Sequence, residues 1–471
     1  MSQSLVSMAG MLEIFALLLS NRWIDRWQKG RSGKSQPTPK KLKKKLTCRS
    51  FYKRIFSLRV TLWYLIFQRL NFDTTLAAVV NDVRCGGADR LSGRGGKLSN
   101  KLRSTRTSAY NQARQRMPLE LLQDVLRHWA KAIVKLVAWE RPRQILDGST
   151  LAVLTNPSLA KAYSPARYKG GATDWSIMRI VVGFCARSGA VLSAIEGAVQ
   201  RSEQALAWKL MEQAVRGTIW IGDSNFGVYS MVAQARRYKQ DVLFRLTKAR
   251  AAKLCQSCRL RRNQERQVQW IPSRHDQVAP GTQRQPITGR LIYLRCRKNG
   301  SWIHLWLFTT LNSEEAPLSL LVEWYAQRWQ AELNFRSVKT HLKMEELFVS
   351  TPQMAQKEFY AGMLAYSLIR IVMWKAGERL EGGIKLISFS QARRWLQHSL
   401  KNWGSGLHTS SKDMTRWIKA LLQVTIDLAL PKRKKPRPSE IRRIRRRSAK
   451  FSAFSGSRAA ARARYLKPKT L

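Results

Sequence analysis

Acidic residues are scarce in this chain of 471 residues, which has 29 Asp and Glu against 85 Lys and Arg. The formal net charge of +56 and the pI near 11.2 are far more than solubility requires. An excess of this size predicts a polyanionic partner, because Lys and Arg gain affinity by displacing the counterions condensed on phosphates. Nucleic acid is the leading candidate, and an anionic membrane surface is the second.

The sequence also lacks an apolar run long enough to cross a bilayer, which takes about 20 residues. The most apolar N-terminal stretch, VSMAGMLEIFALLLS, contains Glu13 and has no basic region before it, so it does not resemble a secretory signal. We therefore expect a soluble protein without membrane association, located in the cytoplasm and associated with the nucleoid.

Cysteines are few and scattered, and the six of them predict no disulfide framework. Cys255 and Cys258 form one CxxC pair, but no second pair and no suitable Cys/His pair follows them. Two reduced thiols near a surface loop are therefore a better interpretation than a zinc site.

Composition changes along the chain predict roughly two to four domains. Helical spacing over residues 51–140 is typical of a small basic domain that reads duplex DNA, or of a packing domain with a solvated basic face. The expected segments are a basic N-terminal arm or linker (1–50), a helical DNA-binding domain (51–140), the first part of an α/β core (141–249), a β-rich insertion (250–311), the second part of the core (312–350), a C-terminal helical region (351–430) and a disordered Arg/Lys-rich tail (431–471).

Short apolar runs within 141–249 alternate with helical patterns, which predicts an α/β fold. Three strands, a helix, a strand, a helix and a strand are expected there, followed by three strands in the insertion. Residues 312–342 then predict one long helix capped by Asn312 or Ser313, with glutamates in its first turn.

Two aspartates follow apolar residues where a strand is expected. Asp147 follows QIL, and Asp223 follows TIWIG. A charge within or at the end of a buried strand is costly unless something neutralises it. Either residue alone could equally be an ordinary turn aspartate, because Asp-Gly and Gly-Asp are common turn pairs.

A single glutamate, Glu332, lies among cations on the expected long helix. At about 100° per residue, four polar side chains project within roughly 40° of Glu332, and apolar side chains that include Trp329 and Leu333 flank this strip as packed edges. The four are Tyr325, Arg328, Arg336 and Lys339. The strip could hold a carboxylate over a site with cations on nearby phosphates, or it could contain only i,i+4 ion pairs worth a few tenths of a kcal/mol.

Together, Asp147, Asp223 and Glu332 fit phosphoryl-transfer chemistry with two divalent ions about 3.5–4 Å apart. Magnesium prefers oxygen ligands and keeps several waters, so a few carboxylates suffice to hold it. The absence of a His-rich cluster agrees with this interpretation.

The spacing Tyr, two residues, Arg, three residues, Glu, six residues, Lys is complete at Tyr325, Arg328, Glu332 and Lys339. With ILDGSTL and IGDSNFGVYS upstream, the sequence resembles the bacterial insertion-sequence-four transposases over roughly residues 60–400. That family has an RNase-H-like DDE core, so the resemblance implies a mixed sheet with flanking helices, interrupted by a β-rich insertion, after a helical N-terminal domain.

The resemblance also implies roles for individual residues. Asp147, Asp223 and Glu332 would be the catalytic triad that binds two Mg²⁺ or Mn²⁺ ions, and Tyr325, Arg328 and Lys339 would contact phosphates near the scissile bond. Arg336 shares their face but lies outside the signature. In relatives an aromatic residue of the insertion stacks on a flipped base; Trp302 and Trp306 are the candidates here, or equally core residues of a strand.

The expected function is thus metal-dependent cleavage and strand transfer at the ends of an insertion sequence, which is cut-and-paste DNA transposition. Double-stranded DNA, at the transposon ends and the target, would be the partner, bound by a homodimer. A nuclease or resolvase with the same triad is the first alternative. A basic nucleic-acid-binding protein without enzymatic activity is the second.

Overall fold

The computed structural model describes residues 10–17, 22–32, 55–71, 75–137, 141–168, 171–255, 264–298, 301–405 and 411–430. The expected basic linker from residue 33 to 50, Cys258 of the CxxC pair and the expected tail from residue 431 lie outside these ranges. Within them, no helix is both long and apolar enough to cross a membrane.

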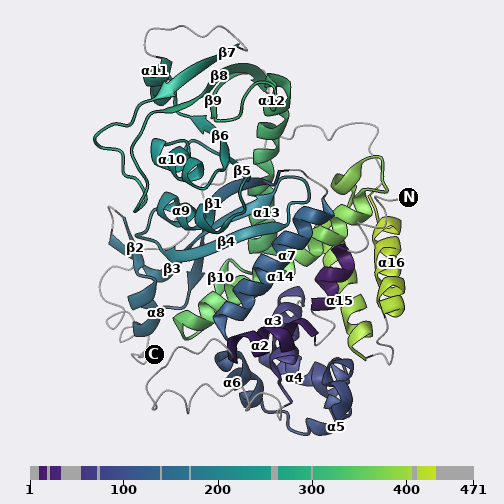
Figure 1. Cartoon of the computed structure of the whole chain (residues 1–471). Helices are drawn as coiled ribbons and strands as arrows, with labels where there is room; N and C mark the ends of the chain where they lie inside the picture. Colours follow the sequence, from purple (N-terminus) through teal and green to yellow (C-terminus); the bar gives the residue numbers. More distant parts are fainter. Residues whose placement is uncertain are drawn as a thin grey trace, which may run out of the picture.

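The centre of the molecule is a mixed sheet with helices on both sides, which confirms the α/β class (Figure 1). β1 pairs in parallel with β5, and β5 with β6, whereas β3 pairs antiparallel with both β1 and β4. The strands run over Arg143–Val153 (β1), Pro165–Tyr168 (β2), Gly171–Cys185 (β3), Val191–Ala198 (β4), Ile219–Gly222 (β5), Asp241–Leu246 (β6) and Glu346–Leu347 (β10). Strand β2 pairs with β3, and β10 with the end of β1.

The three strands of the 250–311 segment extend this same sheet. They are β7 (Gln264–Trp270), β8 (Ile287–Lys298) and β9 (Ser301–Thr309), and they follow α11 (Lys248–Cys255). β9 pairs antiparallel with β6, and β8 lies between β9 and β7. The β-rich segment is thus joined to the core by backbone hydrogen bonds, at the top of Figure 1.

The alternation of apolar side chains along β1 separates two cores, since successive strand residues point to opposite faces. Leu146 packs with α9 (Glu203–Gln213) and α10 (Tyr229–Arg237). Ile145 and Leu151 belong to the larger core on the other face. That face carries α7 (Leu119–Leu136), α13 (Gln330–Arg336) and α14 (Pro352–Gly377), and α7 and α14 run side by side through the centre of Figure 1.

The remaining helices lie around α14 and below the sheet in Figure 1. They are α2 (Arg22–Ser32), α3 (Leu58–Leu70), α4 (Leu76–Arg84), η2 (Asp89–Gly95), α5 (Leu98–Lys101), α6 (Ser108–Arg116), α8 (Pro157–Ala162), η5 (Gly383–Leu386), α15 (Phe389–Ser405) and α16 (Ser411–Asp427). Residues 10–17 are also helical, and their Met11, Ile14 and Phe15 are completely buried. Part of the expected N-terminal arm is therefore folded into the core, because its apolar side chains find a surface to cover.

A buried ion cluster ties the N-terminal helices to α14. The carboxylate of Glu358 accepts hydrogen bonds from Arg69 on α3 and Arg114 on α6, and the Arg69 Nε bond is 2.6 Å long. The neighbouring Lys357 Nζ donates to the carbonyls of Arg114 and Gln115, at 3.2 and 2.8 Å. A single carboxylate and two backbone carbonyls thus compensate for the burial of three cations.

The helix expected over 312–342 is not continuous, and its predicted start was wrong. It consists of α12 (Leu318–Ala326), the 3₁₀ turn η3 (Gln327–Trp329), α13 and the π turn η4 (Ser337–His341). Its N-cap residue is Pro317. Proline keeps the residue before it out of the helical conformation, so the helix does not start earlier in the chain. Asn312 instead accepts the Glu315 N–H at 2.7 Å in the turn that precedes the helix.

Candidate active site

Asp147 lies inside β1, opposite Val182 of β3, rather than in a turn. Its Oδ1 accepts the N–H of Gly148 at 2.9 Å. Burial raises the pKa of Asp147 to about 6 against the lowering effect of that hydrogen bond, and the charge of Asp223 raises the pKa further. The surroundings of Asp147 thus do not fully compensate the negative charge of its carboxylate.

Asp223 follows the carboxyl end of β5, the strand next to β1 in the sheet. Its Oδ1 accepts the Asn225 N–H at 2.9 Å, and its carbonyl accepts the Phe226 and Gly227 N–H groups, both at 3.2 Å. A Cβ on Gly227 would meet the Arg245 carbonyl at 2.0 Å, so this turn needs glycine where it crosses β6. The turn fixes Asp223 beside β1, within electrostatic range of Asp147.

Glu332 on α13 approaches this pair through Arg328. Helix α13 packs on β1, and the Arg328 Nη2 donates to Glu332 Oε1 at 3.2 Å. The Arg328 guanidinium also lowers the pKa of Asp147, so it acts electrostatically on both carboxylates. Its side chain is 14% exposed, whereas that of Glu332 is 48% exposed. The ion pair considered from helix spacing is therefore present.

Tyr325 is buried on α12, under the same carboxylates. Burial raises its pKa to about 12, and a hydrogen bond with Arg328 opposes this rise. Asp223 and Arg245 act on Tyr325 as well, which places the phenol at the meeting point of β5, β6 and α12. Tyr325, Arg328, Asp147 and Asp223 are thus brought together from distant parts of the sequence.

One edge of the expected polar strip is exposed rather than packed, and the prediction for it was wrong. Trp329 is 53% exposed and Leu333 is 54% exposed. Helical spacing alone does not show which side of a stripe is covered. Arg336 is exposed as well and acts electrostatically on His341, one turn further on; Lys339 lies in η4, which continues this helix.

The two candidate tryptophans of β9 differ in their surroundings. Trp302 is 43% exposed, and the Arg295 guanidinium lies 4.2 Å from its ring centre. Trp306 packs partly against the core and stacks on Tyr293 with ring centres 5.3 Å apart. Trp302 is thus accessible to a partner, while Trp306 contributes to packing.

The sequence interpretation missed Glu203, the first residue of α9. Ser202 caps this helix, since its Oγ accepts the Ala205 N–H at 3.1 Å. The Glu203 carboxylate lies directly over Gly148 and accepts the Asn225 Nδ2 at 2.7 Å. Burial raises its pKa, Arg179 lowers it and Asp223 raises it. No local pattern signals this contact, since it depends on where α9 meets β1.

The donors present fit a divalent cation by their chemistry. They are carboxylate oxygens, and Asp147 and Glu203 both repel Asp223 in a strongly basic protein. Within the described ranges, however, no three His, Cys, Asp or Glu side chains stand close enough together to hold an ion. The carboxylate of Glu332 forms an ion pair with Arg328.

Comparisons with known proteins agree with this site. Residues 138–368 match the family model described as a transposase DDE domain, and this range contains Asp147, Asp223 and Glu332. The chain is 23% identical over 290 residues to the transposase InsG for insertion sequence element IS4 of Escherichia coli K12, over 58% of this chain and 63% of that protein. It is 31% identical over 94 residues to the putative transposase y4zB of Sinorhizobium fredii, of which it covers 25%.

Residues 138–368 therefore form a transposase DDE domain. The similarity to InsG agrees with the insertion-sequence-four type expected from the sequence. The chain spans less than two thirds of InsG and about a quarter of y4zB. Among solved structures, the piggyBac transposase synaptic complex with hairpin DNA matches with a TM-score of 0.40 and 10% identity, over 91% of this chain and 86% of that one.

Proposed function

We propose that this protein is a DNA transposase that cleaves the ends of its insertion sequence and joins them to target DNA. The observation that carries the proposal is the meeting of Asp147 and Asp223, from neighbouring parallel strands, with the Tyr325–Arg328–Glu332 face of α12 and α13 inside a DDE domain. A protein that only packs nucleic acid would have no use for repelling carboxylates in such a basic chain.

The strand arrangement supports an RNase-H-like core. The order β4-β3-β1-β5-β6, with β1, β5 and β6 parallel and β3 and β4 antiparallel, places a strand-borne aspartate at the centre of the sheet. In this proposal 141–249 and 312–350 form that core, 250–311 is its insertion, and 51–140 and 351–430 are the flanking helical regions.

Asp147 and Asp223 would hold divalent metal, with Glu332 as the third ligand once Arg328 turns to a phosphate. A pair of Mg²⁺ or Mn²⁺ ions would supply the activation of water or a 3′-hydroxyl and stabilise the leaving oxygen. Arg328 could thus pair with either of two anions, the Glu332 carboxylate or a phosphate of the DNA.

The other residues of the signature would position DNA. Tyr325 is held by burial, and Lys339 follows on the same helix beyond Glu332, so both can meet phosphates on either side of the scissile bond. Arg336 would add a phosphate contact at the rim. Trp302, exposed on β9, would stack on an unpaired base, whereas Trp306 would support it from the core side.

Transposition joins two DNA ends, so the active form would be a homodimer on DNA, associated with the nucleoid. The test uses DNA that carries the element's ends, in the presence of Mg²⁺. Asp223→Asn and Glu332→Gln should bind this DNA with normal affinity and fail to cut it, whereas Glu314→Gln, an exposed carboxylate outside the site, should cut like the wild type.

Product analysis separates the remaining functions. Strand joining after cleavage supports a transposase, and nicking without joining would indicate a nuclease or resolvase. Cleavage by Asp223→Asn at the wild-type rate would refute the role of the carboxylates altogether.

A further inference from the structure

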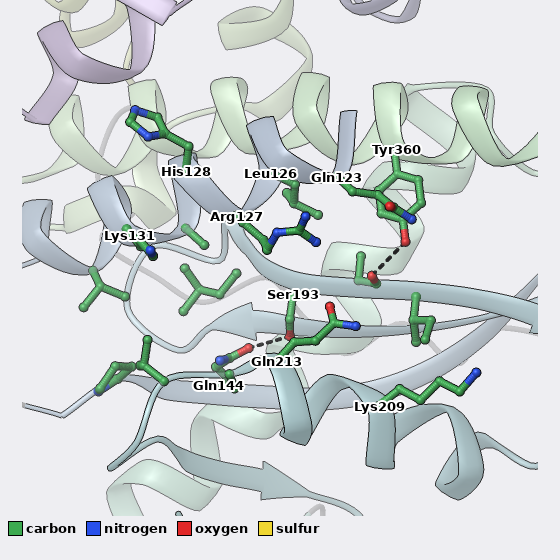
Figure 2. A pocket seen from close by; sticks show the side chains of 18 of the residues that line it. Gln123, Leu126, Arg127, His128, Lys131, Gln144, Ser193, Lys209, Gln213 and Tyr360 are labelled. Carbon is green, nitrogen blue, oxygen red and sulfur yellow. Dashed lines mark hydrogen bonds between the residues drawn. The ribbon is translucent and has the colours of Figure 1, made fainter. Parts of the chain in front are cut away.

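A cavity of about 880 Å³ lies along the outer edge of β4, two strands away from Asp147 in the sheet (Figure 2). β4 pairs with β3 on one side, and among the described strands none pairs with its other side. Helices α7 and α9 both contact β4 and line the cavity from the two faces of the sheet. The cavity is therefore a slot between two helices, with a strand edge at its base.

Strand β3 lies between the slot and Asp147, since Val182 of β3 pairs with Ala194 of the slot on one side and with Asp147 on the other. Pro142 and Gln144, at the start of β1, line the slot, as do Ala214 and Val215, which precede β5. Asp223, in contrast, follows the carboxyl end of β5. A ligand in the slot would therefore be separated from Asp147 by β3.

Cations dominate the rim of the slot. Arg127, Lys131 and Lys135 follow one another on α7 in steps of four residues, which are about 6 Å along a helix. Lys209 on α9 and Arg201 face them from the other side, as Figure 2 shows for Lys209. This is a spaced row of positive charge, suited to successive phosphates of one strand.

Most of these charges lack compensation. Two carboxylates line the slot: Glu13 forms an ion pair with His128 at 3.3 Å, and Glu196 accepts hydrogen bonds from Tyr163 and Gln356, both at 2.7 Å. Arg127 pairs with Asp124. For Lys131, Lys135 and Lys209 the described part of the chain provides no carboxylate within ion-pair distance, so these three lysines can receive an anion.

The base of the slot is apolar and cannot readily accept another β-strand. Its lining includes Leu126, Val134, Leu192 and Ile195. The edge of β4 is partly occupied, because the Ala194 carbonyl accepts the Tyr360 hydroxyl at 3.3 Å and the Ala198 carbonyl accepts the Arg201 N–H at 3.0 Å. An added peptide strand would find these acceptors taken, which favours a nucleic acid over an acidic peptide.

We propose that the slot binds single-stranded DNA. The phosphates lie on Lys131, Lys135 and Lys209, and the bases lie over the apolar base of the slot, an arrangement in which a cationic groove follows the backbone while bases rest on apolar surface. A duplex would not bind in this way, because its bases are paired with each other and cannot lie over the apolar base of the slot. The site goes beyond the proposed function, because it does not depend on the carboxylates.

The test compares two triple variants of the full chain by fluorescence anisotropy with a labelled oligothymidylate. Lys131→Gln, Lys135→Gln and Lys209→Gln should weaken binding about tenfold and reduce the slope of log affinity against log salt by about 2, since a phosphate contact on a single strand contributes about 0.7. Lys161→Gln, Lys412→Gln and Lys419→Gln remove the same charge from other exposed positions and should leave both quantities unchanged.

A second variant tests entry into the slot. Ala130→Phe fills space at its base and keeps every cation, so it should weaken binding of the oligothymidylate and leave a duplex of equal length unaffected. Equal losses in the two triple variants, or an unchanged affinity of the Ala130→Phe protein, would overturn the proposal.

Cleavage assays keep this result separate from the proposed function. The slot variants should still cut short duplexes that carry the element's ends, and Asp223→Asn should still bind the oligothymidylate. Wild-type protein that binds single strands but does not cut would contradict the proposed function alone. Slot variants that cut normally and bind single strands normally would contradict the slot alone.

Discussion

Gly148 is the residue where three parts of the proposed active site meet. It follows Asp147 on β1, donates to that carboxylate, and leaves room for the carboxylate of Glu203 from α9. Glu203 in turn holds the side chain of Asn225, whose N–H donates to Asp223. Because Gly148 has no side chain, Glu203 can lie against it, and the hydrogen bonds from Glu203 through Asn225 fix the position of Asp223.

Substituting Gly148 tests this arrangement. A Cβ there would lie 2.3–2.6 Å from the Glu203 carboxyl atoms, so Gly148→Ala should displace Glu203 and break its bond to Asn225. We expect a loss of about 1 kcal/mol in the free energy of unfolding, the usual contribution of one such bond, together with slower DNA cleavage. Urea unfolding and a cleavage time course measure the two effects.

Two further variants control for this result. A Cβ on Gly30 of α2 meets nothing within 4 Å, so Gly30→Ala should not destabilise the protein. Glu203→Ala alone removes the same bond and also the clash, so adding Gly148→Ala to Glu203→Ala should cost little further stability. If the double variant is as unstable as the sum of the singles, Glu203 is not the group that Gly148 accommodates.

The candidate residues that the structure brings together are those with a local signal in the sequence. The structure brings Asp147 and Asp223 into range of each other and links Glu332 to them through Arg328, but their role as metal ligands stays a prediction. Glu203 could not be identified in advance, because its contact with Gly148 is set by the packing of α9 on the sheet. The exposure of Trp329 was misjudged for the same reason, since a helical stripe does not reveal what covers it.

At the scale of elements, strands were predicted more accurately than the long helix. The apolar runs of β1, β3 and β5 are each bounded by turn residues, which makes their extents visible in the sequence. The break at η3 and the π turn η4 leave the apolar and polar periodicity almost unchanged, so periodicity could not reveal them. The start at Leu318 was available from Pro317, a stronger signal than the Asn312 and Ser313 caps.

Among the contacts between helices, those of Glu358 should contribute most to the free energy of unfolding. It is buried on α14; burial alone would raise its pKa, but Arg69 and Arg114 hold the pKa below its usual value. Glu358→Ala would leave two buried guanidinium groups without their carboxylate, so it should cost about 3–5 kcal/mol in the free energy of unfolding. Glu378→Ala, which removes an exposed partner of Lys375, should cost less than about 1 kcal/mol. Equal effects would show that the buried cluster does not hold α14 to α3 and α6.

Lys357, next to Glu358, predicts a dependence of stability on pH. Burial lowers its pKa to about 8, and Arg114 lowers it further. Between about pH 8 and 10.4 the unfolded chain binds a proton that the folded chain releases. The contribution of Lys357 to the free energy of unfolding therefore rises with pH in this window and is lost as the pH falls through it. Relative to Lys357→Met, the wild type should gain about 2–3 kcal/mol between pH 7 and 10.5.

Urea unfolding of both proteins at several pH values measures this difference. The exposed Lys412 is the control, because Lys412→Met should differ from the wild type by the same amount at every pH. A flat difference for Lys357→Met as well would mean that Lys357 is protonated in the folded protein throughout.

At the scale of the whole molecule, α14 connects regions that the sequence separates into domains. It contacts α3, α6, α7, α15, α16 and β4, and almost all of its residues from Met354 to Trp374 are buried. The larger core is continuous from Met11 to Leu422. A boundary between a helical N-terminal domain and the catalytic core is therefore absent from the packing, although the sequence patterns change there.

Because α14 is shared, the helical regions and the sheet should unfold together. Amides of α14, of α3 and of the buried strands β1 and β5 should show the same slowest exchange with deuterium, limited by global unfolding. The urea transitions followed by tryptophan fluorescence and by far-UV circular dichroism should coincide. Glu358→Ala provides the contrast, since cutting the link between α14 and the N-terminal helices should let α3 exchange faster than β1. A wild-type protein in which α3 already exchanges faster than β1 would mean that the N-terminal helices unfold on their own, and that the domain boundary expected near residue 140 has an energetic counterpart.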